Sequence, residues 1–231
     1  MSKPHHIGIV ACSAEGASLC YRTICHEGSK LLGPHVHPEV SLHSQSLADY
    51  AACLDANDLQ GVANLMLASA RKLAASGAEF LICPDNTSHQ AFSMVEPVSP
   101  LPWLHIADVV ADEAVARGYR RVGLTGTHWL VASDVYPSRL LARGLQFDRP
   151  SDAERDELGR LIMDELVNGI FKEETVVYFQ SVIRGFHARG CDAVILGCTE
   201  IPLIINDTNS ALPTLDSTRL LARAALRRAV S

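Results

Sequence analysis

The sequence has no run of 18 or more apolar residues, although 48% of its 231 residues are hydrophobic. A transmembrane helix needs such a run, so membrane insertion is not expected. The polar N-terminus, MSKPHH, also lacks the apolar core of a signal peptide, and the cytoplasm is the expected location. Lysine and arginine are scattered and the formal net charge is -6, which argues against a nucleic-acid-binding surface. Small molecules are the expected partners.

The sequence also lacks the residue clusters that hold common cofactors. It contains no glycine-rich loop of the P-loop or dinucleotide-binding type. Its seven cysteines do not form the tight pairs of a zinc ribbon, and we expect most of them to be reduced thiols in the core. The loop 26–43 carries His26, His35, His37 and His43, but no carboxylate or cysteine cluster completes a zinc site there. No metal and no cofactor are therefore expected.

Strand-like and helix-like segments alternate along the chain. Segments that read as strands occur at 5–12, 38–44, 78–83, 119–127 and 191–198. The first alternates little and is β-branched, as expected of a strand buried on both faces. Helical apolar spacing, in several cases closed by glycine, occurs at 59–77, 106–118, 151–170, 174–189 and 217–230. This alternation predicts an α/β fold with mostly parallel sheets and with functional side chains at the carboxyl ends of strands.

Two pairs of segments are similar to each other at nearly the same separation. Residues 76–87 align with 189–200 at an offset of 113, and residues 6–14 align with 121–129 at an offset of 115. Any α/β protein repeats glycine–strand units, so the match alone has a trivial explanation. Polar residues follow the strand in both copies, however, which favours an internal duplication.

The duplication predicts a protein of two pseudo-symmetric α/β lobes. We expect one lobe at residues 1–107 together with 216–231, the other at residues 108–215, and the active site in the cleft between them. The alignment pairs Asp85 with Cys198. Each lobe would thus offer one titratable strand-end residue to a shared site.

The polar residues that follow the two strands suit the binding of an anion. Asp-Asn-Thr (85–87) and Cys-Thr-Glu (198–200) stand where a helix should begin, so their side chains and backbone N–H groups could hold a carboxylate. Two titratable groups on opposite walls could also remove a proton from one face of a carbon and return one to the other face. A thiol suits this task because its ordinary pKa, about 8.5, lies close to neutrality.

Several segments resemble the cofactor-independent aspartate/glutamate racemases. DNTSHQ is similar to the family's Asn-Thr-x-His motif, and LGCTEIPLII to its Gly-Cys-Thr-Glu motif. Further similarity lies in VGLTGTHWLVASDVY, LIMDELVNGIF and LPTLDSTRLLARAA, so the resemblance spans nearly the whole chain. It implies two pseudo-symmetric α/β domains, no pyridoxal phosphate, a homodimer, and racemisation of an acidic amino acid such as aspartate or glutamate.

The resemblance assigns two catalytic positions, one occupied by the family's usual residue and one by a different residue. Cys198 is the cysteine of Gly-Cys-Thr-Glu, and Asp85 occupies the catalytic position before Asn-Thr, where family members have cysteine or threonine. Cys83 lies two residues too early, about 6 to 7 Å deeper along an extended strand, and is expected to be structural. Two other roles fit Asp85: it could cap a helix that begins near Thr87, or hold the substrate ammonium.

Substrate-binding residues follow from the same comparison. The expected set consists of short polar residues at the strand ends: Ser13, Asn86, Thr87, Thr127 and Thr199. Supporting roles are expected for Glu200 and for His89, which could equally be a structural histidine. The first loop, ACSAEG, replaces the family's Gly-Gly-Met-Ser, and Leu130 replaces a threonine, which weakens aspartate as the assigned substrate.

Two other functions remain compatible with these residues. A single-cysteine decarboxylase or isomerase of the same superfamily would use Cys198 alone. A non-catalytic binder of small carboxylates would close on its ligand without turnover. Exchange of the α-proton of L-aspartate or L-glutamate in D₂O separates the three, because a binder exchanges nothing and one competent base exchanges without racemising.

Overall fold

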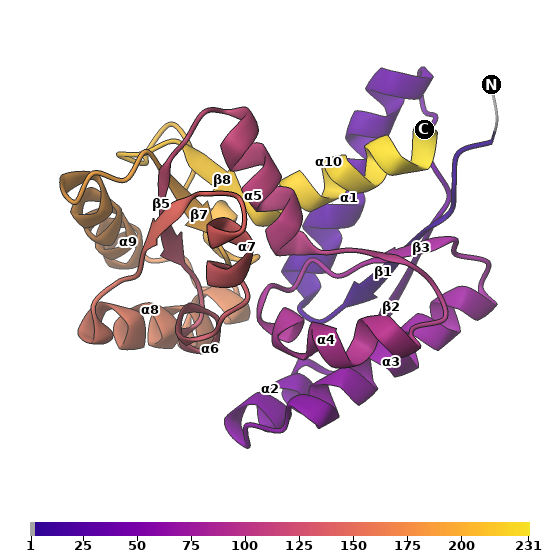
Figure 1. The fold of residues 1–231 in the computed structure, drawn as a ribbon, viewed down its shortest axis with the longest axis horizontal. Helices are drawn as coiled ribbons and strands as arrows, with labels where there is room; N and C mark the ends of the chain where they lie inside the picture. Colours follow the sequence, from indigo (N-terminus) through magenta and orange to yellow (C-terminus); the bar gives the residue numbers. More distant parts are fainter. Residues whose placement is uncertain (1–2) are drawn as a thin grey trace. The chain divides into compact units, whose positions relative to one another are not determined.

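The computed structural model describes residues 3–231, and this part of the chain divides into two compact units. The first contains the described residues up to Ile106 together with Thr218–Ser231, and the second contains Ala107–Ser217. Each unit has its own four-stranded parallel sheet flanked by helices (Figure 1). The predicted α/β class with two pseudo-symmetric lobes is confirmed.

The first unit is built on a sheet with the strand order β2-β1-β3-β4. Its strands are β1 (Ile7–Ala11), β2 (Val40–Ser44), β3 (Phe80–Ile82) and β4 (Trp103–Leu104). Its helices are α1 (Ala14–Leu32), α2 (Leu47–Asp55), α3 (Leu59–Ala75), η1 (Thr87–Ala91), α4 (Phe92–Val95), η2 (Glu96–Val98) and α10 (Ser217–Val230). Val10 and Leu81 on the sheet join Met66 and Ala70 of α3 in one buried cluster, so α3 covers this face.

The second unit repeats this plan with the strand order β6-β5-β7-β8. Its strands are β5 (Arg121–Thr125), β6 (Gln146–Asp148), β7 (Ala193–Leu196) and β8 (Thr214–Asp216). Its helices are α5 (Ile106–Ala116), α6 (His128–Ala132), α7 (Pro137–Leu141), α8 (Asp152–Asp164), η3 (Leu166–Asn168), α9 (Glu173–Ala188) and η4 (Ile201–Leu203). Helix α9 packs so closely on β5 that a Cβ atom at Gly123 would lie 2.5 Å from the Phe186 ring.

The strand register confirms the internal duplication. In the first sheet Ile7 of β1 pairs with Phe80 of β3, and in the second Val122 of β5 pairs with Ala193 of β7. An offset of 115 carries Ile7 onto Val122, and an offset of 113 carries Phe80 onto Ala193. Both sequence alignments therefore match residues at the same height in equivalent strands, and Asp85 and Cys198 are structural counterparts.

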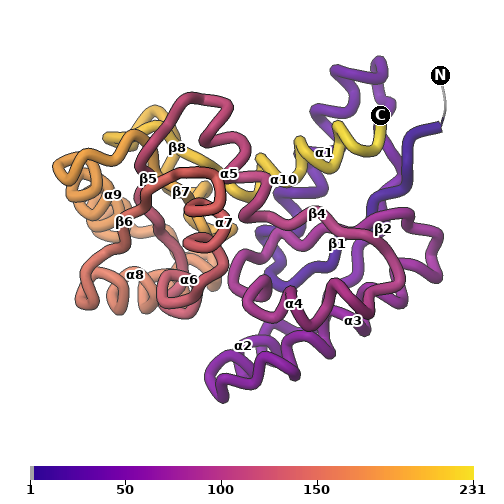
Figure 2. The backbone as a smooth tube through the Cα atoms, in the orientation of Figure 1, coloured from indigo at the N-terminus to yellow at the C-terminus, as the bar shows by residue number. Residues whose placement is uncertain are grey.

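The helix that follows the fourth strand of each sheet belongs mainly to the other unit. Strand β4 of the first unit leads into α5, most of which belongs to the second unit, and β8 of the second unit leads into α10, most of which belongs to the first. The tube in Figure 2 follows α10 beside α1. Arg223 of α10 donates three hydrogen bonds of 2.9 to 3.0 Å to Glu27 of α1, and Arg228 lies 4.8 Å above the Phe80 ring.

Helix α1 corrects the sequence analysis, which predicted a histidine-rich loop over 26–43. His26 lies on α1 and His43 on the edge strand β2. The buried positions of α1 are mostly small residues at helical spacing: Gly16, Ala17, Cys20, Thr23, Ile24 and Gly28. Because this stripe contains one large aliphatic side chain, it does not stand out as an apolar face.

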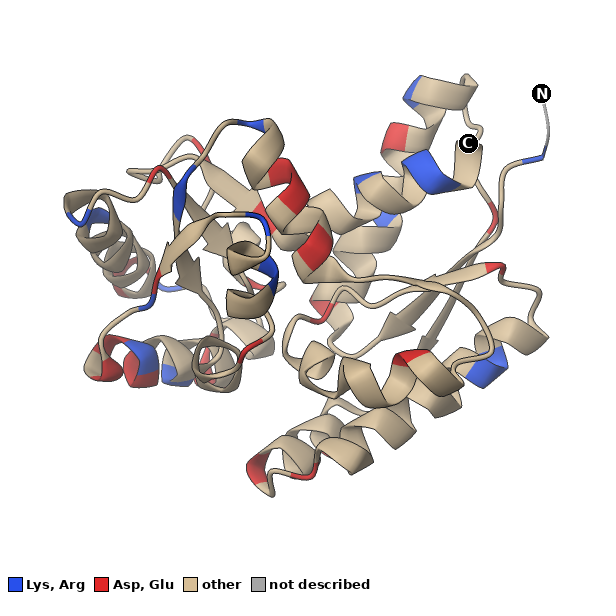
Figure 3. Cartoon of the chain, viewed as in Figure 1, with Lys and Arg blue, Asp and Glu red and all other residues tan. Residues whose placement is uncertain are grey.

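Charged residues are distributed over both units (Figure 3). Among residues 3–231, no helix has the length and apolar content that crossing a bilayer requires.

His43 makes its polar contacts within the first unit, with Nδ1 3.0 Å from the Ser69 hydroxyl and Nε2 3.0 Å from the Lys72 ammonium. Burial, and then the Lys72 charge, lower the pKa of His43.

Candidate functional site

The carboxyl ends of β1 and β3 lie side by side in the first sheet. Ile9 pairs with Ile82, and Cys12 and Asp85 each follow three residues later. Ser13, the next residue after Cys12, caps α1 by accepting a hydrogen bond of 3.3 Å from the Gly16 amide. The predicted polar residues of the first unit therefore gather at one edge of its sheet.

Asp85 begins the turn that follows β3. Its Oδ1 accepts hydrogen bonds of 2.7 Å from both the amide and the hydroxyl of Ser88. Asp85 is half-buried, and Asn86 and Thr87 beside it are buried. The capping role expected for Asp85 is thus present, with one carboxylate oxygen engaged by the 3-10 helix η1.

Cys83 lies within the core. Its side chain is 1% exposed, it belongs to the cluster between the sheet and α3, and its Sγ is 3.7 Å from the Asp85 carbonyl oxygen. Burial raises the pKa of the Cys83 thiol well above its ordinary value, and the nearby charge of Asp85 adds to this shift. A thiolate is disfavoured there, which supports the structural interpretation of Cys83.

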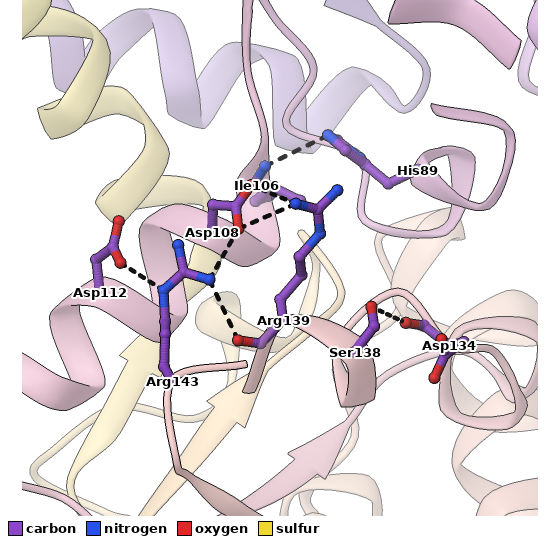
Figure 4. A network of polar contacts seen from close by, with 8 residues as sticks. All are labelled: His89, Ile106, Asp108, Asp112, Asp134, Ser138, Arg139 and Arg143. Atoms are coloured by element: carbon purple, nitrogen blue, oxygen red, sulfur yellow. Dashed lines mark hydrogen bonds and ion pairs between the residues drawn. The ribbon is translucent and has the colours of Figure 1, made fainter. Parts of the chain in front are cut away.

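His89 reaches from η1 to the next strand connection. Its ring is 3% exposed, with Nδ1 2.8 Å from the Asp85 carbonyl oxygen and Nε2 3.4 Å from the Ile106 amide nitrogen. The ring also stacks on Phe92 and meets His105 edge-on, at centroid distances of 5.5 and 4.6 Å. His89 therefore joins the turn after β3 to the first residue of α5 (Figure 4).

Tyr50 is a residue near these strand ends that the sequence analysis missed. It is the buried residue of α2, at 1% exposure. Burial raises the pKa of the Tyr50 hydroxyl, and the nearby Asp85 carboxylate adds to this shift. The segment 47–55 was not predicted as a helix, and no motif surrounds Tyr50, so the sequence carried no signal for it.

The second sheet presents an equivalent edge. Thr125 of β5 pairs with Leu196 of β7, and Thr127 and Cys198 each follow two residues later. Thr127 caps α6 by accepting a hydrogen bond of 3.2 Å from the amide of Leu130. The Leu130 side chain lies over Gly126 and Gly197, 2.8 and 2.7 Å from the positions that Cβ atoms would occupy. Leu130, noted above as a departure from the family, thus packs over both turns.

Cys198 points at a buried carboxylate. Its Sγ lies 3.0 Å from Oε2 of Glu200, and the Thr199 hydroxyl donates to the same oxygen at 2.7 Å. Glu200 is 2% exposed. In this contact the thiol is the donor and the carboxylate oxygen is the acceptor. This geometry gives Cys198 a built-in partner for proton transfer.

An ion-pair network braces α5 against α7 within the second unit (Figure 4). Arg139 and Arg143 both pair with Asp108, at 3.1 and 3.0 Å. Arg143 also donates to Asp112 at 2.5 Å. These partly exposed pairs hold α5 to α7 and to Arg143, which follows it.

The structure groups the predicted residues by unit. Ser13, Asp85, Asn86, Thr87 and His89 belong to the first unit, and Thr127, Cys198, Thr199 and Glu200 belong to the second. Each group lies at the carboxyl edge of its sheet, as expected for an α/β protein. The cleft shared by the two lobes stays a prediction.

Known proteins share this architecture and sequence pattern. The family described as Asp/Glu/Hydantoin racemase matches residues 8–225. The crystal structure of a candidate Asp/Glu racemase from Yersinia pestis has a TM-score of 0.89 and 30% sequence identity, covering 98% of this chain and 100% of that one. An aspartate racemase homologue from Pyrococcus horikoshii OT3 has a TM-score of 0.83 and 28% identity, with 100% of both chains covered.

A curated relative is more distant. RacX of Bacillus subtilis (strain 168), described as a broad specificity amino-acid racemase, is 21% identical over 156 residues, which make up 66% of each protein. The family match covers most of the chain, and both solved structures extend over nearly all of it. The chain belongs to the Asp/Glu/Hydantoin racemase family.

Proposed function

We propose that the protein is a cofactor-independent amino-acid racemase in which Asp85 and Cys198 move the α-proton. The observation that carries this proposal is the contact of 3.0 Å between the Cys198 thiol and the buried Glu200 carboxylate. A strand-end thiol with its own acceptor can release and recover a proton without an external base. Family membership supplies the reaction class, which is that of an isomerase.

The proton inventory closes over one forward and one reverse turnover. In one direction the Asp85 carboxylate takes the α-proton, the resulting carbanion receives the Cys198 thiol proton on its other face, and a thiolate remains. In the reverse direction that thiolate takes the α-proton of the opposite enantiomer and protonated Asp85 returns one. When Cys198 must start as a base from its thiol form, Glu200 accepts the thiol proton first, across the contact of 3.0 Å, and protonated Asp85 supplies the proton on the other face. The proton held by Glu200 then returns to Asp85 through solvent.

The α-carboxylate of the substrate is proposed to bind the short polar residues at the two sheet edges. These are Ser13, Asn86, Thr87, Thr127 and Thr199, all buried. Several hydrogen bonds are needed because a carboxylate loses its hydration on binding. An acidic amino acid, aspartate or glutamate, is the proposed substrate, because both well-covered solved relatives are described as acidic amino-acid racemases or their homologues.

One observation favours the single-cysteine alternative. Oδ1 of Asp85 already accepts two hydrogen bonds from Ser88, as a purely structural helix cap would. If Asp85 only caps η1, Cys198 alone exchanges protons and one enantiomer loses its α-proton without being racemised.

The test is hydrogen exchange at the α-carbon in D₂O. D- and L-aspartate, glutamate and a panel of neutral and basic amino acids are incubated with the protein, and loss of the α-proton is followed by ¹H NMR beside chiral chromatography. Cys198→Ala and Asp85→Asn are expected to abolish racemisation, whereas the control Cys83→Ala retains at least a tenth of the rate. No exchange with any amino acid would reject the racemase proposal in favour of a binder.

Assembly and location complete the proposal. We propose a cytoplasmic homodimer, as the family resemblance implies. Size-exclusion chromatography with light scattering tests the dimer, and a mass corresponding to one chain of 25.0 kDa would contradict it.

A further inference from the structure

The two polar contacts of His89 are compatible with one state of the imidazole ring. A carbonyl oxygen can only accept, so Nδ1 must carry the hydrogen in its contact of 2.8 Å with Asp85. A backbone amide can only donate, so Nε2 must present its lone pair to the Ile106 N–H at 3.4 Å. The neutral Nδ1–H tautomer satisfies both partners, and every other state loses at least one.

The ring is held from both sides as well as at its nitrogens. Phe92 stacks on it with an interplanar angle of 13°, and His105 meets its edge at 68°. At 3% exposure the ring has little freedom to rotate away from its partners. Packing therefore restricts the position of the ring, and the two hydrogen bonds determine its tautomer.

Asp85 is fixed at two points by residues of a single turn. The Ser88 amide and hydroxyl hold its side chain, and the His89 ring holds its carbonyl oxygen. The direction of the Asp85 carboxylate therefore depends on the orientation of its own peptide group. The Ile106 amide holds the other side of the His89 ring. Ile106 is itself fixed in position because it closely follows β4, whose Leu104 pairs with Ile82 of β3.

The second unit contains a comparable brace made by different chemistry. Ile106 follows β4 as Ser217 follows β8, and the Ser217 hydroxyl donates a hydrogen bond of 2.8 Å to the carbonyl oxygen of Leu196 in β7. The offset of 113 that carries Asp85 onto Cys198 carries His89 onto Pro202, which has no polar side-chain atom. In each unit, hydrogen bonds connect the third strand, or the turn after it, to the first residue of the helix that follows the fourth strand. The first unit uses the His89 imidazole for this connection, and the second uses the Ser217 hydroxyl.

We propose that His89 is the positioning residue of Asp85, acting through its Nδ1–H donor to the Asp85 carbonyl while Ile106 holds the ring through Nε2. His89 does not itself exchange a proton with substrate. This inference rests on the proposed function of Asp85, and it assigns to His89 an effect on the chemical step rather than on substrate binding.

Two conservative variants separate the two contacts. The amide nitrogen of asparagine can take the place of Nδ1, so His89→Asn keeps the donor to Asp85 and loses the acceptor for Ile106. Glutamine reaches as far as Nε2, so His89→Gln keeps the acceptor and loses the donor. We expect kcat to fall at least ten-fold in His89→Gln and less than three-fold in His89→Asn, with KM changed less than two-fold in both.

Phe92→Leu provides the matched control. It removes the ring that stacks on His89 and lowers stability by leaving a space in the buried cluster of the first unit. It leaves the contacts of His89 Nδ1 with Asp85 and of Nε2 with Ile106 in place. We expect it to lower the unfolding temperature as much as His89→Gln does while retaining most of kcat. Equal kcat in His89→Gln and His89→Asn, or an equal loss in Phe92→Leu, would overturn the positioning role.

Two measurements decide the inference even if the protein racemises nothing. Long-range ¹H–¹⁵N spectra of the intact chain should show a protonated Nδ1 and an unprotonated Nε2 at His89. Hydrogen exchange of the Ser88 amide, which donates to Asp85, should be at least ten-fold faster in His89→Gln than in His89→Asn. An Nε2–H tautomer, or equal exchange at Ser88, would refute the positioning role, whereas absent turnover with both results intact would reject only the racemase proposal.

Discussion

Replacing Glu200 with glutamine tests the proton acceptor of Cys198 with almost no change in shape. The Glu200 oxygen receives hydrogen bonds from the Cys198 thiol at 3.0 Å and from the Thr199 hydroxyl at 2.7 Å. A glutamine side chain can still accept these hydrogen bonds, but it cannot take up the thiol proton, so Glu200→Gln removes the step in which Glu200 acts as a base. Proton transfer by a positioned side chain contributes about 10²–10⁴-fold to a reaction rate.

We therefore expect Glu200→Gln to lower Cys198-dependent α-proton exchange by about 100-fold or more. The loss should affect the enantiomer whose proton Cys198 removes more than the enantiomer served by Asp85. The assay is ¹H NMR of each enantiomer separately in D₂O, with initial rates normalised to folded protein.

Glu174→Gln on the exposed face of α9 is the matched control and should exchange at the parent rate. Since Glu200 is buried, its replacement also affects stability, and circular dichroism must show that the variant is folded at the assay temperature. Exchange by Glu200→Gln at or above the parent rate for both enantiomers would refute the role of Glu200 as the proton acceptor.

Two further predictions concern the scaffold of the units. The Arg223 guanidinium, through its hydrogen bonds, lowers the pKa of Glu27, so this pair stabilises the protein above the ordinary carboxyl pKa and loses its effect as pH falls through the lowered value. The difference in urea midpoint between the parent and Glu27→Gln should be present at pH 7 and shrink between about pH 5 and pH 3; a difference independent of pH would contradict the linkage. A Cβ atom at Gly123 would lie 2.5 Å from the fully buried Phe186 ring. Gly123→Ala should therefore lower the free energy of unfolding by about 1–3 kcal/mol and lower the melting temperature. An unchanged melting temperature would show that α9 can move away from β5 without loss of stability.

The sequence was sufficient for the parts of the structure that depend on local pattern. The segments 78–83 and 191–198 are short apolar runs that each follow a glycine and can be recognised as strands, and the offset between them pairs Asp85 with Cys198. Strand register preserves that offset because paired strands advance by the same rise per residue. The equivalence of the two strand ends could therefore be predicted.

The contacts made by these residues could not be predicted. His89 meets Ile106 through a bond between residues 17 apart, which depends on β3 and β4 lying side by side. Helix α1 was missed because its buried stripe consists mainly of small residues, and α2 because it buries little besides Tyr50. Both failures have one cause: burial against a neighbouring element leaves no periodic signal when the buried side chains are small or few.

The exchange of α5 and α10 between the two units determines the order in which the protein can mature during synthesis. The first unit lacks α10 until Ser217–Val230 has been made, and α10 supplies the Arg223 contact to Glu27. Because α10 follows Ala107–Ser217 in the sequence, the whole second unit is synthesised before the first unit can acquire its last helix. Domains generally fold as units and N-terminal domains first during synthesis, so this chain departs from that order: the unit that begins first cannot be completed first.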